Sequence, residues 1–323
     1  MDKEKIVREN VFRESEETKG IAVRGYDFDD GVDWEKIIES YRSTGAQATN
    51  LSTAISIVNK MISEKAFIFL GYTSSMVSSG LRDVFRYLVK HKKINVAVTT
   101  AGGIEEDIIK CLGDFVIGDF RADGGELRGK GINRIGNIFA ANNRYIEFEK
   151  FVQQILQEML DEKEIWTPSE IIWKLGEKIN DESSICYWAF KNKIKIYCPA
   201  ITDGAFGDNV YFFRLQGKDL KIDIARDAEE FNNTTIGLAK SGLIILGTGI
   251  VKHSILNANM LRNGADYAVY VNTASEYDGS DAGALPSEAV SWGKIKENAE
   301  SVKVFADATI VFPLIVAESF AKN

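Results

Sequence analysis

The sequence predicts an α/β fold in which a mostly parallel, doubly wound sheet carries helices on both faces. Six short apolar runs support this fold, because each is followed by a helical pattern or a long loop, as in strands buried on both faces. The composition also indicates a globular protein with a full core, since the 323 residues are 45% hydrophobic and 27% charged and include only four prolines. Residues 21–323 are therefore expected to form one domain, preceded by an arm of residues 1–20.

The N-terminal part of the chain is expected to be helical. Residues 1–20 are rich in charge at helical spacing and end at Gly20, which predicts a solvated helical arm at the periphery. Apolar residues then recur every three or four positions over residues 34–41 and 46–62, so these two segments are predicted to be amphipathic helices.

The core of the fold is predicted from the six apolar runs. The predicted strands are residues 66–70, 94–98, 194–198, 243–246, 267–271 and 302–305. The helices predicted between and after them are residues 81–89, 104–112, 251–261 and 309–320. A mostly helical insertion is predicted around 120–193, where Thr167 and Glu170 flank a proline in the pattern of a helix start.

Loops of small and polar residues follow all six predicted strands. Ligands of open α/β sheets bind beyond the carboxyl ends of the strands, so six such loops favour a site for a cofactor and a substrate. The dinucleotide fingerprint is incomplete, because Gly247-Thr248-Gly249 lacks the third glycine. A pyrophosphate is therefore expected at the helix start in residues 73–79, although ordinary helix capping explains those serines equally well.

Residues 272–296 have the composition of a binding site for an organic cation. The acidic and hydroxyl side chains in this segment include Asp278, Ser280, Asp281 and Glu288. A cation is attracted to carboxylates and to the face of an indole such as Trp292, and a desolvated lysine such as Lys294 can become a nucleophile. A regular helix would point Lys294 away from Glu288, so the hypothesis requires the helix to end at Gly293.

Other candidate residues have ordinary alternatives. His253 follows a predicted strand-end loop and could be a general base, a ligand donor or a capping residue. Glu105 and Glu106 lie near the start of a helix, where carboxylates are favourable regardless of function. Asp203 and Asp208 lie five residues apart in a glycine-rich loop, and capping does not account for both.

Charge, cysteines and hydropathy argue against several classes of protein. A net charge of −8 disfavours binding to nucleic acid. The charged amino terminus has no apolar signal core, and no apolar run reaches the roughly 18 residues of a membrane span. Three cysteines without a CxxC pair indicate free thiols in a reducing compartment. With only two histidines, no metal site is expected. We expect a soluble cytoplasmic protein.

Long stretches of the chain resemble the deoxyhypusine synthase family, from Ile21 to Ala321. The matching stretches are VRGYDF, TGAQATN, VTTAGGIEEDIIKCL, LRGKGINRIGN, TDGAFGD, VKHSILNANMLRNGADYAVYVNTA, EYDGSD, EAVSWGKI and KVFADATIVFPLIVAE. The resemblance implies a Rossmann-like fold and a homotetramer, a dimer of dimers with NAD and spermidine sites at the dimer interface. It also implies transfer of the 4-aminobutyl group of spermidine, through an enzyme lysine, to a lysine of the translation initiation factor 5A precursor, with release of 1,3-diaminopropane.

Carried over residue by residue, the resemblance makes Lys294 the nucleophile and His253 the proton acceptor. The implied NAD-binding residues are Ser74, Ser75, Met76, Val77, Ser78, Thr100, Ala101, Gly102, Glu106, Asp203, Thr248, Thr273, Ala274, Asp307 and Ala308. The implied spermidine-binding residues are Glu105, Asp208, His253, Gly279, Ser280, Asp281, Glu288, Trp292 and Lys294. The chain departs from the family pattern at Thr248, Ser254 and Leu285, and none of these departures removes a proposed catalytic group.

Two alternatives to this function stay open at the level of sequence. Homospermidine synthases resemble the same family and use putrescine as the acceptor in place of a protein lysine. A catalytically silent regulatory paralogue is the other alternative, although such a protein would be expected to lose the lysine or the NAD contacts. The family's amino-terminal element can cover a neighbouring active-site entrance, which gives residues 1–20 a candidate role.

Overall fold

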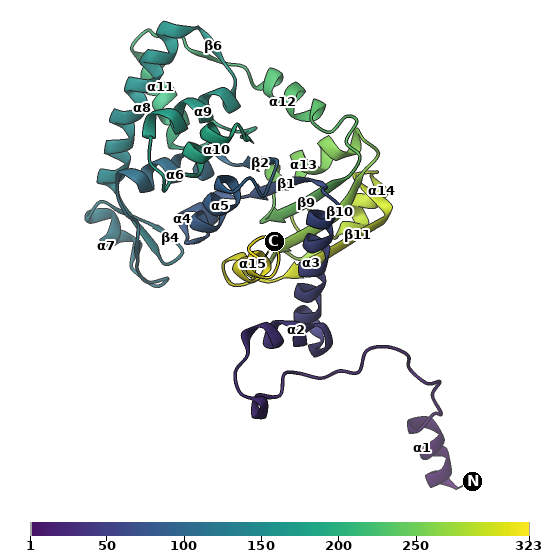
Figure 1. Cartoon of the computed structure of the whole chain (residues 1–323). Coiled ribbons are helices and arrows are strands. Elements are labelled where there is room, and N and C mark those ends of the chain that lie inside the picture. The colour runs from purple at the N-terminus through teal and green to yellow at the C-terminus, as the bar shows by residue number, and fades with distance from the viewer. Residues whose placement is uncertain (1, 323) are drawn as a thin grey trace.

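The protein is described here by a computed structural model covering residues 2–322, and its centre is a six-stranded parallel sheet (Figure 1). The strands are β1 (Phe67–Tyr72), β2 (Val96–Thr99), β7 (Lys195–Tyr197), β9 (Ser241–Leu246), β10 (Ala265–Asn272) and β11 (Ile295–Phe305). Their order across the sheet is β11-β10-β9-β1-β2-β7, and every pairing is parallel. Each of the six predicted strands is therefore present, and the α/β prediction is confirmed.

The sheet is doubly wound around the pair β1 and β9. The chain lays down β1, β2 and β7 toward one edge, then returns to β9 and continues through β10 to β11 at the other edge. Tyr72 at the end of β1 pairs with Thr99 on one side and Leu246 on the other, so three strands end level. This is the topological switch point at which ligands bind in such sheets.

Helices cover both faces because side chains alternate along each strand. Leu70 and Tyr72 belong to the core on one face, whereas Phe69 belongs to the core on the other. The helices that contribute to the first face include α3 (Ala46–Ser63), α5 (Leu81–Lys90), α6 (Ala101–Leu112) and α15 (Ala308–Ala317). Those that contribute to the second face include α12 (Ile224–Asn233), α13 (Ile250–Met260) and α14 (Pro286–Ser291).

The insertion between β2 and β7 contains more strand than the sequence predicted. Its helices are α7 (Gly124–Gly129), α8 (Asn142–Glu162), α9 (Pro168–Ile179) and α10 (Ile185–Asn192). It also contains an antiparallel sheet of β3 (Val116–Ile117), β4 (Ile132–Ile135) and β5 (Ile138–Ala141). A two-residue turn at Gly136, with φ +59°, joins β4 to β5, and the prediction of a mostly helical insertion missed this hairpin.

The predicted start of α9 is confirmed in detail. The backbone N–H of Thr167 donates to the Glu170 carboxylate at 2.9 Å, and the backbone N–H of Glu170 donates to the Thr167 hydroxyl at 3.3 Å. The remaining short elements are β6 (Ile165–Trp166), paired with β8 (Lys221–Ile222), α4 (Ser74–Ser78), α11 (Ala205–Leu215), η1 (Phe28–Asp30) and η2 (Glu276–Asp278).

The N-terminal arm extends away from the sheet (Figure 1). Its helix α1 (Lys3–Val11) has no buried residue, and α2 (Trp34–Thr44) leads from the arm into α3. Within residues 2–322, no helix is long and apolar enough to cross a membrane.

Candidate active site

The loops at the carboxyl ends of β1, β2 and β9 meet at the switch point. The backbone N–H of Ser74 donates to the Thr100 hydroxyl at 3.1 Å, and a Cβ at Gly102 would come within 2.5 Å of the Ser74 Cβ. A Cβ at Gly247 would come within 2.7 Å of the Thr73 hydroxyl oxygen. The predicted cofactor residues of the first two loops are thus packed against each other, and Thr248 lies beside them in the third.

Helix α4 is joined to helix α6 through Glu106. The Ser78 hydroxyl donates a hydrogen bond to the Glu106 carboxylate, whose side chain is buried. Burial raises the pKa of Glu106 to about 7, and the hydrogen bond from Ser78 opposes that rise. The ammonium of Lys110 donates to the carbonyls of Val77, Ser78 and Ser79 at 3.0–3.1 Å, which fixes the carboxyl end of α4.

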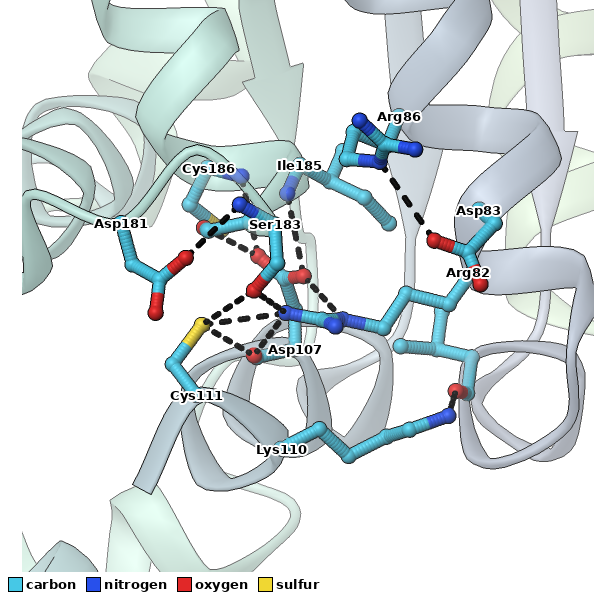
Figure 2. A network of polar contacts seen from close by, with 12 residues as sticks. Arg82, Asp83, Arg86, Asp107, Lys110, Cys111, Asp181, Ser183, Ile185 and Cys186 are labelled. Carbon is cyan, nitrogen blue, oxygen red and sulfur yellow. Dashed lines mark hydrogen bonds and ion pairs between the residues drawn. The ribbon is translucent and has the colours of Figure 1, made fainter. Parts of the chain in front are cut away.

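Asp107 anchors α6 within the fold, and the sequence analysis did not identify it as important. Figure 2 shows its carboxylate between the guanidinium of Arg82 on α5 and the amino end of α10. It accepts hydrogen bonds from Arg82 Nε at 2.8 Å, the Ser184 hydroxyl at 2.6 Å, and the backbone N–H groups of Ile185 at 3.0 Å and Cys186 at 2.9 Å. This network holds α6, the helix that contains Glu105 and Glu106, against α5 and α10.

A second acidic group lies beyond the ends of β2 and β7. The Glu105 carboxylate is buried, accepts the backbone N–H of Phe206 at 2.8 Å and lies against Gly204. Burial raises the pKa of Glu105, and the nearby charges of Asp208 and Asp203 raise it further. We call Glu105, Asp203 and Asp208 the acidic cluster, and a cation bound there would relieve this repulsion.

Lys294 lies at the opposite edge of the sheet in a small cavity of about 30 Å³. Its lining residues are Lys252, Leu256, Asp281, Ala284, Leu285, Glu288, Ala289, Trp292 and Lys294. The Lys294 side chain is buried, and its Nζ lies 5.5 Å from the centre of the exposed Trp292 ring. One carboxylate oxygen of Asp281 is buried without a hydrogen-bond partner among the described residues, so an ammonium group would satisfy it.

The helix end required before Lys294 is confirmed. Helix α14 ends at Ser291, and Gly293 adopts φ +69°. The N–H groups of Gly293 and Lys294 donate to the carbonyls of Val290 and Ala289, both at 2.9 Å. This left-handed turn directs the chain from α14 into β11 and brings Lys294 into the same cavity as Glu288.

The remaining candidate residues lie in three places. Asp307 caps α15 by accepting the N–H of Thr309 at 2.8 Å, and Ala308 begins that helix, both beyond the end of β11. The predicted residues Thr273, Ala274, Gly279 and Ser280 lie in the loop between β10 and α14. His253 is exposed on α13 and lines a separate cavity of about 290 Å³ with Tyr197 and Phe231, not the Lys294 cavity.

A single chain does not bring the acidic cluster and Lys294 together. The acidic cluster follows β2 and the edge strand β7, whereas Lys294 immediately precedes the other edge strand, β11. Five strand spacings of ~4.8 Å separate the two edges by about 24 Å. Figure 1 shows α11 and α14 correspondingly on opposite sides of the protein.

The described residues contain no group of three or more His, Cys, Asp or Glu side chains placed to hold a metal ion.

Comparison with known proteins identifies relatives over nearly the whole chain. A family model described as deoxyhypusine synthase matches residues 36–319. A deoxyhypusine synthase of Senecio vernalis is 49% identical, covering 98% of this chain and 94% of its own length. Homospermidine synthase 2 of the same plant is 48% identical over 97% of this chain and 94% of its own. The crystal structure of a putative deoxyhypusine synthase from Entamoeba histolytica matches with a TM-score of 0.70 and 36% identity, covering 93% of this chain and 97% of its own.

Proposed function

The chain belongs to the deoxyhypusine synthase family, and we propose that it carries out the family reaction with Lys294 as the covalent nucleophile. The reaction transfers the 4-aminobutyl group of spermidine to one lysine of the translation initiation factor 5A precursor and releases 1,3-diaminopropane. The observation that carries the residue assignment is the burial of Lys294 beside an indole and two carboxylates in one cavity.

The switch-point loops suit NAD. When bound, NAD supplies the hydride acceptor for spermidine and the hydride donor for the final reduction. The side chains and backbone amides that would hold it belong to Ser74, Ser75, Met76, Val77, Ser78, Thr100, Ala101, Gly102, Glu106, Asp203, Thr248, Thr273, Ala274, Asp307 and Ala308. The close approach of Gly102 to Ser74 supports this assignment, because it packs the loops after β1 and β2 directly against each other at the switch point.

Spermidine is held in our proposal by two groups of residues from two copies of the chain. One copy supplies Glu105 and Asp208 of the acidic cluster, and the other supplies Asp281, Glu288 and the indole of Trp292. The separation of about 24 Å within one chain supports a composite site. A dimer that joins these two surfaces would contain two equivalent sites, and two such dimers would form the homotetramer.

Both surfaces also expose apolar side chains, which favours their burial against a partner. Trp292 is 65% exposed beside Lys294. On α11, Tyr211, Phe212 and Leu215 are exposed at three, four and seven residues from Asp208, and therefore lie on the same side of the helix. Exposed apolar patches rimmed by charges are typical of protein interfaces.

Lys294 acts as a carrier in the proposed mechanism. In our proposal His253, which lies outside the Lys294 cavity of the single chain, accepts the proton lost from the spermidine amine as the hydride leaves, which gives an imine. The neutral Lys294 amine attacks the imine carbon, the bond from that carbon to 1,3-diaminopropane breaks, and the aminobutyl group remains attached to Lys294 as a new imine. The lysine of the precursor protein then attacks the same carbon and displaces Lys294.

The nucleophile is tested with spermidine labelled in its butyl carbons and with NAD. Borohydride should trap the label on the peptide that contains Lys294, and Lys294→Arg should abolish both trapping and transfer to the precursor. Lys296→Arg is the matched control, since Lys296 lies two residues further along the chain, on β11, and pairs with Asp266 at 2.5 Å. Undiminished transfer by a folded Lys294→Arg protein would exclude Lys294 as the carrier.

The similarity to homospermidine synthase 2 makes putrescine the alternative acceptor. The purified protein should be given the factor precursor and putrescine in parallel reactions. We expect label in the protein to exceed label in homospermidine, and the reverse result would assign the chain to the alternative reaction. Turnover by the purified chain alone also tests the regulatory alternative, because a silent paralogue would require its active partner.

We further propose that the reaction takes place in the cytoplasm and that the N-terminal arm covers a neighbouring active-site entrance. Cys111, Cys186 and Cys198 are free thiols, in keeping with a reducing compartment. Helix α1 exposes the apolar side chains of Ile6 and Val7, so it has surface available for a second subunit.

A further inference from the structure

We propose that Lys303 is a positioning residue that holds the loop between β10 and α14 in its substrate-binding conformation. This loop, residues 273–285, contains Gly279, Ser280 and Asp281 of the proposed spermidine site. The inference rests on the proposed function, because it assigns Lys303 a role in binding at that site.

Lys303 bridges the two ends of the loop. It lies on β11 opposite Tyr270, is 8% exposed, and directs its ammonium beneath the loop. Its Nζ donates to the carbonyl of Ala274 at 2.6 Å and to the carbonyl of Gly283 at 2.8 Å. One side chain thus ties together two backbone positions that lie nine residues apart in the sequence.

The two ends of the loop touch directly at Gly283. A Cβ at this position would come within 1.6 Å of the Ser275 carbonyl oxygen, so the segments pass each other at a distance that only glycine permits. Lys252 holds the loop from a second direction, because its ammonium donates to the carbonyls of Asp281 and Ala284. Residues 275–283 therefore form a loop closed at its neck and fixed on two buried lysines.

Burying the ammonium of Lys303 costs desolvation free energy, which its hydrogen bonds to the loop have to offset. Among residues 2–322, no ion pair joins Lys303 to a carboxylate, and its hydrogen-bond acceptors are the two loop carbonyls. Its Nζ also lies 5.8 Å from the centre of the Phe305 ring. A buried charge without an anionic partner is costly, so an apolar side chain would be favoured by stability alone. The internal hydrogen bonds of the loop are local: the Ser280 N–H donates to Asp278 at 2.8 Å and the Gly279 N–H donates to the Glu276 carbonyl at 3.3 Å, while Tyr277 is 90% exposed.

Lys303 acts on the substrate only through the loop. It does not line the Lys294 cavity, whereas Asp281 of the loop does. Loss of its two hydrogen bonds should release the neck and allow Asp281 to leave the cavity, which weakens spermidine binding. Lys294 is held separately, by the turn at Gly293, and the chemical step should be retained once the substrate is bound.

The loop is tested first without substrate, by hydrogen exchange of the full-length protein. In Lys303→Met, peptides covering residues 273–285 should exchange about tenfold faster, while peptides from β1 and β9 should be unchanged. The control is Lys60→Met, which removes a lysine that contacts Glu300 of the same strand at an exposed pair. Unchanged exchange in the loop of folded Lys303→Met would overturn the proposal.

Kinetics then test the positioning role. Lys303→Met should raise the KM for spermidine about tenfold and change kcat less than about twofold, and Lys60→Met should change neither. Faster loop exchange without a higher KM would also overturn the positioning role.

If wild type shows no transfer, the proposed function fails, and the exchange result still reports on the loop. Gly283→Ala is the second variant, to be used if Lys303→Met does not fold. It separates the neck while retaining Lys303, and it should also show faster exchange in the loop and a higher KM for spermidine.

Discussion

The Ser78 hydroxyl donates a hydrogen bond to the carboxylate of Glu106, and this contact joins α4 to α6 at the switch point of the sheet. The pairing fixes the short helix that follows β1 against the helix that follows β2. Because burial raises the pKa of Glu106 to about 7, a carboxylate at the proposed cofactor site changes its charge near neutral pH.

Stability should depend on pH through Glu106. In the unfolded chain its pKa is near 4.5, so the folded protein binds the additional proton between pH 4.5 and 7. The resulting contribution to stability is fully present below pH 4.5 and is lost as pH rises through 7. As pH rises from 4 to 8.5, wild type should therefore lose unfolding free energy that Glu106→Gln keeps. The difference between the two proteins should change in favour of the variant by up to about 3 kcal/mol, from a pKa shift of about 2.5.

Unfolding measured at both pH values checks this prediction at fixed protein concentration. Glu149→Gln is the control, because Glu149 is exposed on α8 and its substitution should leave the pH dependence of wild type intact. A stability difference between Glu106→Gln and wild type that stays constant with pH would contradict the raised pKa.

Asp107 should be essential for stability although it does not face the substrate. Asp107→Asn removes the charge that balances Arg82 and places an amide where four donors converge, so it should cost about 3–5 kcal/mol of unfolding free energy. The matched control is Asp83→Asn, because the exposed Asp83 carboxylate pairs with the half-buried Arg86 at 3.4 Å, with an expected cost below about 1 kcal/mol. Equal costs for the two variants in denaturant unfolding would refute the anchoring role.

The sequence was informative where a structure depends on local pattern. The strands β1, β2, β9 and β10 are apolar runs buried on both faces. The turn before Lys294 required a residue that tolerates positive φ, which Gly293 provides. The hairpin around Gly136 was missed because its strands are four residues long and partly exposed, so they show no clear apolar run. Asp107 directly follows Glu105 and Glu106, so the sequence offers three adjacent carboxylates without distinguishing their roles. The structural role of Asp107 depends on contacts with α5 and α10, which are distant in sequence.

The indole beside Lys294 should contribute to spermidine binding. A cation over the face of Trp292 is stabilised by about 1–2 kcal/mol, so Trp292→Ala should raise the KM for spermidine about 5- to 30-fold. Trp292→Phe should lie between wild type and alanine, because its ring attracts cations less strongly. Steady-state kinetics measure the effect, and Trp34→Ala, at an exposed tryptophan of α2, is the control that should leave the KM unchanged.

If the site is composed of residues from two chains, mixing two inactive variants should restore activity, which a site within one chain would not allow. Lys294→Arg and Asp208→Asn should each be inactive alone, because each variant damages every site of its homodimer. Refolded together in equal amounts, half of the dimers should contain both variants, and one of the two sites in each should combine an intact Lys294 with an intact Asp208. Activity should therefore return to about a quarter of that of wild type.

The control for this experiment refolds together two variants whose substitutions lie on the same surface of the proposed site. Lys294→Arg and Glu288→Gln both damage the surface that contains the Lys294 cavity, so a mixed dimer has no intact site and activity should stay at the level of the separate variants. Recovery with Asp208→Asn but not with Glu288→Gln would assign the acidic cluster and Lys294 to different chains. Failure of both mixtures, in dimers shown by mass spectrometry to be mixed, would mean that one chain supplies the whole site. The about 24 Å between the edges of the sheet argues against that result, because movement on that scale would require β7 or β11 to leave the sheet.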